Sequence, residues 1–414
     1  MLRQVLIYTA VLLSCSFDRV QADDWPEFRG PTGQGLVSKG KLPTTWGQDK
    51  NVTWKKEVPG KGWSSPAVAG GRVYLTTAVP GDGGDQSLHA LCLDAAGGNI
   101  LWDKAVFHQD GAKSPSIHGK NSHASPTPLV HNGKLFVHFG HQGTACLDLD
   151  GKVLWRNTTL RYAPVHGNGG SPILVDDTLV FSCDGGDEGF VVALNAADGS
   201  LRWKTPRTVE AAKKFSFSTP LLIDVDGQKQ IVSPGSNVVC AYDPADGKEI
   251  WRVRYDGYSV IPRPVYGHGL VFICTGYERP SLLAIRADGK GDVTDTHVVW
   301  KTSKAVPHTP SLLLTGKELY MISDGGVASC LDAQTGAVHW QQRLGGNYSA
   351  SPLLADNRLY FQSEQGTGVV VHAGKEFKLL AKNALDEHSL ATPAAADGAL
   401  FIRTEKHLYR IGPR

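Results

Sequence analysis

The sequence predicts an all-β fold, an eight-bladed β-propeller built from four-stranded antiparallel blades. Three observations predict it: a hairpin motif that ends on tryptophan, a hairpin motif that opens on proline, and two chain ends that complete one another. The tryptophans recur at steps of 40 to 53 residues, a period typical of solenoids and propellers. The chain has 47 glycines and 23 prolines but only 2 methionines, which is typical of short strands joined by many turns.

The tryptophan motif is clearest in CLDAQTGAVHW at 330–340, with near-copies at 92–102 and 146–155. An apolar strand is followed by Asp and Gly, which supply a tight turn, and by an alternating strand that closes on Trp. We therefore expect a hairpin whose Trp packs between adjacent blades. The tryptophans stand at positions 54, 102, 155, 203, 251, 300 and 340. Blade seven has Leu380 at this place, so its packing against a neighbour is expected to be looser.

The proline motif, such as SPAVAGGRVYLTT at 65–77, predicts a second hairpin in each unit. Its eight copies begin at residues 65, 127, 171, 219, 263, 309, 351 and 392. The last unit stops three strands into its blade, whereas NVTWKKEV at 51–58 is a Trp strand without a blade. We predict that 51–58 completes the C-terminal blade and closes the ring, because closure removes two exposed sheet edges.

Residues 1–22 are predicted to be a signal peptide. The segment VLIYTAVLL is apolar but too short to span a bilayer, and cleavage after Ala22 fits the small-residue rule. The alternative is a bacterial lipobox, Leu-Leu-Ser-Cys, with a lipid anchor on Cys15. No later apolar run is long enough for a transmembrane segment. The expected location is periplasmic or secreted, with an anchored lipoprotein as the alternative.

The remaining chain is divided into an extended N-terminal arm, 23–50, and the propeller, 51–414. The arm carries Trp25 and Trp46, and we expect these two to matter far less for stability than the tryptophans of the propeller. A net charge of +2 gives no electrostatic footprint for nucleic acid, and a monomer is expected. The six cysteines beyond the signal fall in different blades, which predicts buried free thiols: Cys92, Cys146, Cys183, Cys240, Cys274 and Cys330.

The Asp, Gly and Trp repeats resemble those of the PQQ-repeat superfamily over nearly all of the chain beyond the signal. Members of that superfamily include the quinoprotein dehydrogenases and the outer-membrane assembly lipoprotein BamB. The segments DWPEFRGPTGQG at 24–35 and SHASPTP at 122–128 look closer to a group of secreted bacterial propellers with PQQ-like or BamB-like repeats. The resemblance implies the fold and leaves the activity open, because one fold hosts unrelated chemistry.

Three function classes are weighed. The leading one is a non-catalytic binding or assembly propeller, which needs only export and a shaped surface. The second is a hydrolase or lyase on a small or saccharide substrate, although no nucleophile elbow or His-Glu-x-x-His helix appears. The third is a PQQ-dependent dehydrogenase. The resemblance implies for that branch adjacent cysteines and a calcium set, and this sequence has no adjacent cysteines. No cofactor and no metal site are therefore predicted, and PQQ with calcium is disfavoured.

The candidate site follows from propeller geometry, since the residues before each proline motif converge with the loops after each second strand. They are His123, Asn168, Tyr258, Arg263, His308 and His388 from the first set, and His141, Asp184, Asp187, Tyr277, Glu278 and Asp324 from the second. Such a mixed group at one mouth of the channel suits a small polar ligand better than the alternative, an envelope protein partner. Arg263 should point into the channel and need solvent or a partner, for example an anionic ligand. The insertion 103–123 is placed to act as a lid.

Overall fold

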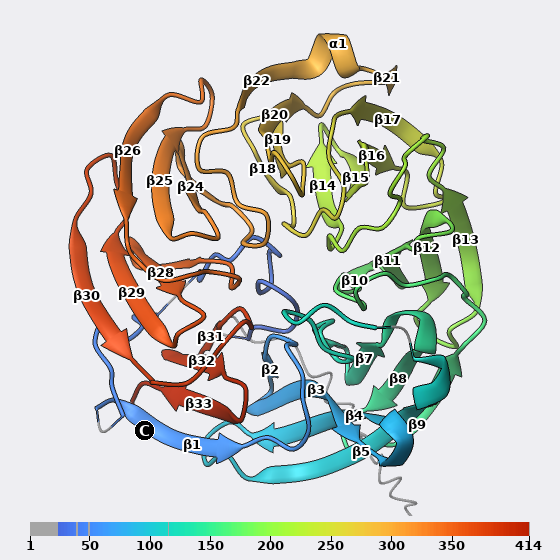
Figure 1. Ribbon diagram of the computed structural model, residues 1–414, viewed down its shortest axis with the longest axis vertical. Helices are drawn as coiled ribbons and strands as arrows, with labels where there is room; N and C mark the ends of the chain where they lie inside the picture. The colour runs from blue at the N-terminus through green and yellow to red at the C-terminus, as the bar shows by residue number, and fades with distance from the viewer. Residues whose placement is uncertain (1–23, 39, 49, 115, 414) are drawn as a thin grey trace, which may run out of the picture.

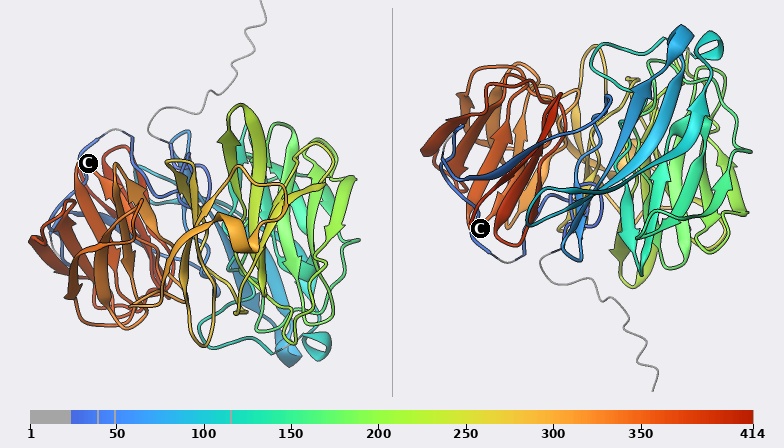
Figure 2. Two further views of the ribbon diagram at one scale, coloured as in Figure 1. Left: turned by 90° about the horizontal axis from the view of Figure 1, so that it is seen from above. Right: turned by 90° about the horizontal axis from the view of Figure 1, so that it is seen from below.

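Eight sheets stand in a ring around a central channel in the computed structural model (Figure 1). It describes residues 24–38, 40–48, 50–114 and 116–413. The signal peptide, its cleavage site and Cys15 lie outside the described residues. Each sheet is one blade, and we number the blades 1 to 8 from the sheet that begins with β2. Views from above and below show the blades side by side around the axis (Figure 2).

Each blade is antiparallel, and its strands follow one another outward from the channel. The innermost strands are β2 (Ala67–Ala69), β6 (Leu129–His131), β10 (Ile173–Val175), β14 (Leu221–Val225), β18 (Val265–Gly267), β23 (Leu313–Thr315), β27 (Leu353–Ala355) and β31 (Ala394–Ala396). The second strands are β3 (Arg72–Pro80), β7 (Lys134–His138), β11 (Thr178–Asp184), β15 (Gln228–Gly235), β19 (Leu270–Cys274), β24 (Glu318–Ile322), β28 (Arg358–Gln362) and β32 (Ala399–Arg403). 

The third strands are β4 (Gln86–Asp94), β8 (Thr144–Asp148), β12 (Gly189–Asn195), β16 (Val238–Tyr242), β20 (Leu282–Arg286), β25 (Val327–Asp332), β29 (Thr367–His372) and β33 (His407–Ile411). The outer strands are β5 (Ile100–Gln109), β9 (Val153–Asn157), β13 (Leu201–Pro206), β17 (Glu249–Arg254), β22 (Val298–Thr302), β26 (Val338–Arg343), β30 (Leu379–Ala384) and β1 (Val52–Glu57). The helical segments are short: η1 (Asp82–Gly84), η2 (Gly111–Lys113), η3 (Gly140–Gln142) and α1 (Thr294–His297).

The ring is closed as predicted. Strand β1 pairs antiparallel with β33, with Val52 opposite Ile411 and Glu57 opposite His407. Blade 4 departs from the plan, because the long turn of the next hairpin adds β21 (Gly291–Asp292) in parallel beside β17. All six cysteines among the described residues are buried free thiols, which confirms that prediction.

The outer part of each blade junction is held by the repeated tryptophan. In the described chain, six of the seven motif tryptophans donate their indole N–H to a carbonyl in the hairpin turn of the next blade. Trp102 donates to Leu149 at 2.9 Å. The turn glycine lies against the same ring, since a Cβ added at Gly151 would stand 2.9 Å from Trp102. The glycine therefore serves both its own turn, at φ +86°, and the close approach of its neighbour's indole.

The inner part of each junction is held by hydroxyl groups. A Ser or Thr stands just before the innermost hairpin in every blade but the fifth. In all of these blades except blade 1, its side-chain oxygen accepts the backbone N–H of the same position in the preceding blade. Six such hydrogen bonds, of 2.9 to 3.0 Å, run around the channel. We call this set the hydroxyl belt: Ser65, Thr127, Ser171, Thr219, Ser311, Ser351 and Thr392. Arg263 takes the place of the hydroxyl in blade 5.

The N-terminal arm lies across one end of the channel (Figure 1, blue). Trp25 exchanges both backbone hydrogen bonds with Val68 of β2, at 2.7 and 2.8 Å. Val130 donates to Pro26, and Val37 donates to Leu354 of β27. The arm therefore adds to the innermost strands of blades 1, 2 and 7, and it closes that end of the channel.

The tryptophans of the arm are buried, so the expectation that they contribute little is wrong. Trp25 is 1% exposed and Trp46 is 5% exposed. The ring of Trp46 stacks on Tyr360 at 6.4 Å between centroids. In five other blades the aromatic residue at the place of Tyr360 packs against the blade's own tryptophan, as Phe136 does with Trp155. The register of β29 with β30 places Ala381, and not the predicted Leu380, at the position of the motif tryptophan, so the prediction was wrong by one residue. Trp46 therefore supplies to blade 7 the ring that this position lacks.

Replacing Trp46 tests whether its ring takes the place of the motif tryptophan that blade 7 lacks. Trp46→Ala should lower the free energy of unfolding by about 3–5 kcal/mol, as expected for truncation of a buried aromatic side chain. Urea titration followed by circular dichroism measures it. Leu379→Ala, at a side chain that is 44% exposed in the same blade, is the control and should change stability by less than about 0.5 kcal/mol. Equal, small effects of both changes would contradict the role given to Trp46.

Candidate functional site

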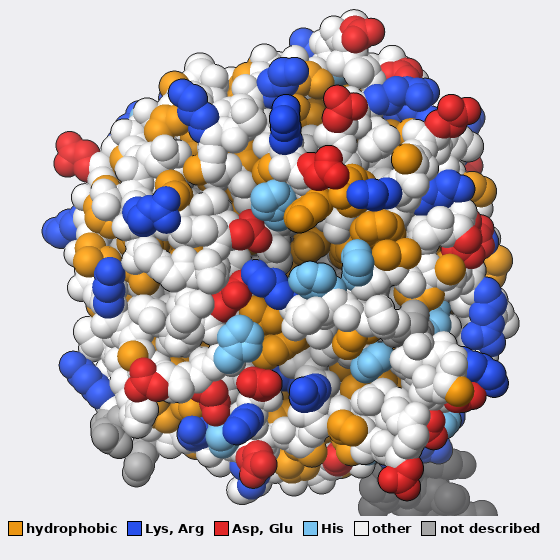
Figure 3. Space-filling view, viewed as in Figure 1, with side chains coloured by type: hydrophobic (Ala, Val, Ile, Leu, Met, Phe, Trp, Pro, Cys, Tyr) orange, Lys and Arg blue, Asp and Glu red, His pale blue; other side chains and the backbone are white. Residues whose placement is uncertain are grey.

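A cavity of about 860 Å³ occupies the channel on the side away from the arm. Its volume lies within the range of about 300–1,000 Å³ that is usual for ligand sites. Phe28 of the arm lines it, and so do six hydroxyl residues of the belt: Ser65, Thr127, Ser171, Ser311, Ser351 and Thr392. On the face seen in Figure 3, histidines and apolar side chains gather around the centre.

Aromatic rings form a continuous wall along one side of the mouth, and neighbouring centroids are 5.3 to 5.8 Å apart. Each ring meets the next edge-on or tilted. Along the wall they are His118, His166, Phe215, Tyr258, Tyr277 and His308. We call these six residues the aromatic wall. Trp63 also lines the cavity, and His388 meets it edge-on at 5.6 Å.

The charged side chains that line the described part of the cavity are paired. Lys213 lies over the ring of Tyr258 and bonds its hydroxyl at 2.7 Å, and that hydroxyl donates to Glu278 at 3.0 Å. Asp324 accepts the backbone N–H of His308 at 2.7 Å. Burial raises the pKa of Asp324, but the hydrogen bonds from His308 outweigh it and the net pKa is lowered. This carboxylate is therefore ionised at neutral pH.

The insertion 103–123 has two parts. Its first part lengthens β5 to Gln109, beyond the outer strands of the other blades, and continues into η2. Its second part reaches the cavity with His118, Lys120 and Asn121. Lys120 forms an ion pair of 2.7 Å with Glu364 of blade 7, although the insertion belongs to blade 1. The loop therefore spans part of the mouth, which is the placement expected of a lid.

Four of the predicted site residues line the cavity: Tyr258, Tyr277, His308 and Asp324. Two more, Glu278 and His388, lie at the rim and contact a lining residue. These six residues lie in the loops that the proline-motif rule selects, either before an innermost strand or after a second strand.

Arg263 points into the channel as predicted, but its partners are protein groups, of the arm and of blade 4. Its guanidinium donates to the backbone oxygen of Phe28 at 2.6 Å, to Glu27 at 3.3 Å and to Pro220 at 3.0 Å. Burial lowers the pKa of Arg263, and the carboxylate of Glu27 opposes that shift. The expected anionic ligand is thus replaced by Glu27, and Arg263 anchors the floor of the cavity.

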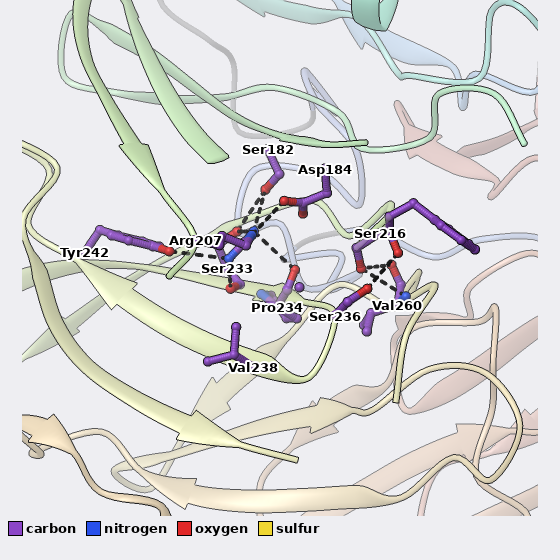
Figure 4. A network of polar contacts seen from close by, with 12 residues as sticks. Ser182, Asp184, Arg207, Ser216, Ser233, Pro234, Ser236, Val238, Tyr242 and Val260 are labelled. Carbon is purple, nitrogen blue, oxygen red and sulfur yellow. Dashed lines mark hydrogen bonds and ion pairs between the residues drawn. The ribbon is translucent and has the colours of Figure 1, made fainter. Parts of the chain in front are cut away.

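Asp184 lies in the interface between blades 3 and 4 and does not line the cavity (Figure 4). Arg207 donates to it at 2.7 Å, and the same guanidinium binds Ser233 and Ser182. Burial raises the pKa of Asp184, with Arg207 opposing the shift. This buried ion pair joins the blades, and its placement at the mouth was wrong.

The other predicted residues lie in blade interfaces or surface loops. Asn168 is buried and binds Tyr162 at 3.0 Å and His141 at 3.3 Å. Asp187 is exposed and accepts the backbone N–H groups of Glu188 in its own loop and of Ala163 in the loop between blades 2 and 3. His123 is half-buried behind the lining residues, and burial lowers its pKa. These residues shape the region around the cavity without lining it.

Sequence reasoning missed the hydroxyl belt, Phe28, Trp63 and half of the aromatic wall: His118, His166 and Phe215. The belt had a visible signal, because Ser or Thr precedes the innermost hairpin in every blade but the fifth. Phe215 and Phe217 also had one, as alternate aromatic residues in KFSFSTP just before a proline motif. Phe28 had none, since it lies in the arm outside the repeat.

Fold and cavity together define a closed propeller with a pocket at one end of its channel. The chain belongs to the family described as outer membrane protein assembly factor BamB, whose model matches residues 36–116, 85–216, 187–294 and 289–376. An uncharacterized protein of Rickettsia conorii is 23% identical over 239 residues, which are 54% of this chain and 52% of that protein. The chain therefore spans about half the length of the curated relative it matches.

Two solved structures illustrate the shared fold. BamB from Moraxella catarrhalis aligns with a TM-score of 0.61 at 11% identity, over 88% of this chain and 97% of that one. The quinohemoprotein alcohol dehydrogenase ADHIIG from Pseudomonas putida aligns with a TM-score of 0.64 at 11% identity, over 95% and 80%. At such identities the likeness shows the fold alone.

The residues around the cavity do not fit a quinone cofactor with calcium. Such a cofactor is a tricarboxylate, whereas the two lining lysines are each paired with a carboxylate, Glu364 or Glu278. In the described ranges no group of three His, Cys, Asp or Glu side chains is placed to hold a metal ion. The two histidines three residues apart, His138 and His141, do not share a site either, because the first contacts Thr144 and the second contacts Asn168.

The buried His138 makes stability depend on pH. Its Nδ1 lies 2.8 Å from the hydroxyl of Thr144, and its ring lies 4.3 Å from that of Phe181. Burial, and then the charge of His141, lower the pKa of His138 to about 3. Because the folded pKa lies below the unfolded value of about 6.5, this stability is fully present above pH 6.5 or so and is lost as the pH falls toward 3.

Between pH 7 and 4.5 the native protein should lose about 2–3 kcal/mol more unfolding free energy than a His138→Gln variant. Urea titrations of both proteins at the two pH values give the difference in unfolding free energy. The contributions of all other titrating groups are common to both proteins and cancel in this difference. An equal loss in both proteins would mean that His138 is not held neutral.

Proposed function

We propose that the chain is an exported, non-catalytic binding propeller that holds a small polar ligand in the mouth of its channel. The observation that carries the proposal is the cavity of about 860 Å³, which the arm closes at the far end. A concave site with apolar walls and a few convergent polar groups is the usual form of a ligand site. The pairing of Arg263 with Glu27 and Phe28 supports a floor that stays in place.

The polar groups of the cavity suit binding better than hydrolysis. Asp324 is the only carboxylate among the described lining residues, whereas glycoside hydrolysis usually uses a pair of carboxyl groups. Its lowered pKa makes it a poor general acid. A hydrolase or lyase remains the second candidate because His308 Nδ1 lies 3.5 Å from Asp324, an arrangement that a general base could use.

Export is part of the proposal and rests on the predicted signal peptide, with an anchor at Cys15 as the alternative. Membership of a family described by outer membrane assembly supports an envelope location and leaves an envelope protein as the alternative partner. Within the part of the chain that the structure describes, no helix has the length and hydrophobicity needed to cross a membrane.

Thermal unfolding of a chain that begins at residue 23 tests the proposal. The panel holds neutral sugars, amino acids, nucleosides and small carboxylic acids at millimolar concentration. At least one class should raise the midpoint, because a ligand present at 100 times its Kd adds about 2.7 kcal/mol to stability.

Two tryptophan variants locate the binding. Ile261→Trp fills the cavity from a lining residue for which no side-chain hydrogen bond has to be broken, and it should abolish the shift. Leu154→Trp, at a site 46% exposed on β9, should keep it. The proposal fails if no class raises the midpoint, or if Ile261→Trp leaves the shift intact.

A further inference from the structure

We infer that the ligand is a neutral carbohydrate, bound with a sugar ring against the aromatic wall and its hydroxyl groups toward the hydroxyl belt. The inference rests on the proposed function and names the chemical class that the cavity would take. Three independent features of the described residues carry it: the exposed rings, the unused hydrogen-bonding capacity of the belt, and the balance of charge.

The aromatic wall offers apolar ring surface to the cavity. Tyr277 is 56% exposed, and no hydrogen bond of its hydroxyl is seen among the described residues. Tyr258 is half-buried, and its hydroxyl is held by Lys213 and Glu278, which fixes the orientation of the ring. Exposed apolar surface of this kind is stabilised when a partner covers it. The C–H face of a sugar ring is such a partner, and the edge of the ring carries hydroxyl groups.

The hydroxyl belt supplies the polar complement. A hydroxyl group can donate one hydrogen bond and accept two. Five of the six belt oxygens that line the cavity accept one backbone N–H, for example Thr127 from Ser65 and Ser351 from Ser311. Among the described residues none of these side chains donates a hydrogen bond to protein. Each therefore retains one donor and one acceptor for the cavity, which is the pair of roles that a sugar hydroxyl fills.

The charges at the mouth leave no counter-charge for an ionised ligand. Lys120 is paired with Glu364 at 2.7 Å, and Glu364 also accepts from Ser349 at 2.7 Å. Lys213 is shared between Tyr258 and Glu278. The third charged residue of the lining, Asp324, is engaged by His308. A carboxylate or ammonium ligand would have to break one of these pairs, whereas a neutral ligand leaves them intact.

A nucleoside would also stack on aromatic rings, but its base needs amide-like partners in the ring plane. The one side-chain amide in the described lining belongs to Asn121. Its nitrogen donates to His166, and its oxygen accepts from Ser122 and Ser125. Because this amide is already engaged, the lining favours a ligand that is recognised through hydroxyl groups alone.

Isothermal titration calorimetry with neutral mono- and oligosaccharides of gluco, galacto, manno and xylo configuration tests the inference on the chain that begins at residue 23. At least one of them should bind. Tyr277→Leu removes a ring but keeps an apolar side chain, and it should weaken binding about tenfold, the equivalent of one aromatic contact. Tyr277→Phe keeps the ring and should bind as the native protein does, which separates loss of stacking from loss of fold.

The same titrations with the corresponding uronic acids and amino sugars test the argument from charge. Neutral sugars should bind more tightly than either. Tighter binding of a charged sugar, or equal binding by Tyr277→Leu, would overturn the inference. If no saccharide binds while another class of the thermal panel gives a shift that Ile261→Trp abolishes, the carbohydrate inference fails and the binding function stands. If nothing binds, both fail.

Discussion

The junction between adjacent blades is the contact on which the whole molecule depends. A four-stranded sheet cannot bury both of its faces alone, so each blade is stable only against its neighbours. Two sets of hydrogen bonds fix that junction at two distances from the axis. Near the rim, indole N–H groups donate to the hairpin turn of the next blade, as Trp102 donates to Leu149. At the channel, belt hydroxyls accept a backbone N–H from the preceding blade, as Ser171 accepts from Thr127.

The hydroxyl belt both joins the blades and lines the proposed binding site. The same hydroxyl that fixes a blade junction also lines the cavity, so the wall of the site is as rigid as the ring itself. Blade 5 is the informative exception, because Arg263 replaces the hydroxyl and binds Glu27 and Phe28. The gap in the belt is therefore where the arm is anchored, and the arm provides the floor that an open channel would lack.

Repeated features of the chain could be predicted from sequence, and isolated ones could not. The fold, ring closure and free cysteines follow from a period that eight units share, and Tyr258, Tyr277, His308 and Asp324 were found by their places in that period. Asp184 also lies at the end of a second strand, but it pairs with Arg207 in the interface between blades. A charged residue near the channel can therefore be neutralised within a blade interface instead of facing the cavity. Trp46 packs on Tyr360 in place of the missing motif tryptophan, and Glu27 reaches Arg263, so each contacts a residue more than 200 positions away. No local pattern encodes such a contact.

The pairing of β1 with β33 has a consequence for how the protein comes into being. Val52 must find Ile411, a separation that spans most of the chain, so this contact carries one of the largest loop-closure costs in the molecule. A chain made or exported from its amino end presents β1 first and must leave it unpaired until the last blade arrives. During that interval the backbone edge of β1 is unpaired and could pair with another molecule. The polar sequence VTWKKE, with its two lysines, disfavours such pairing.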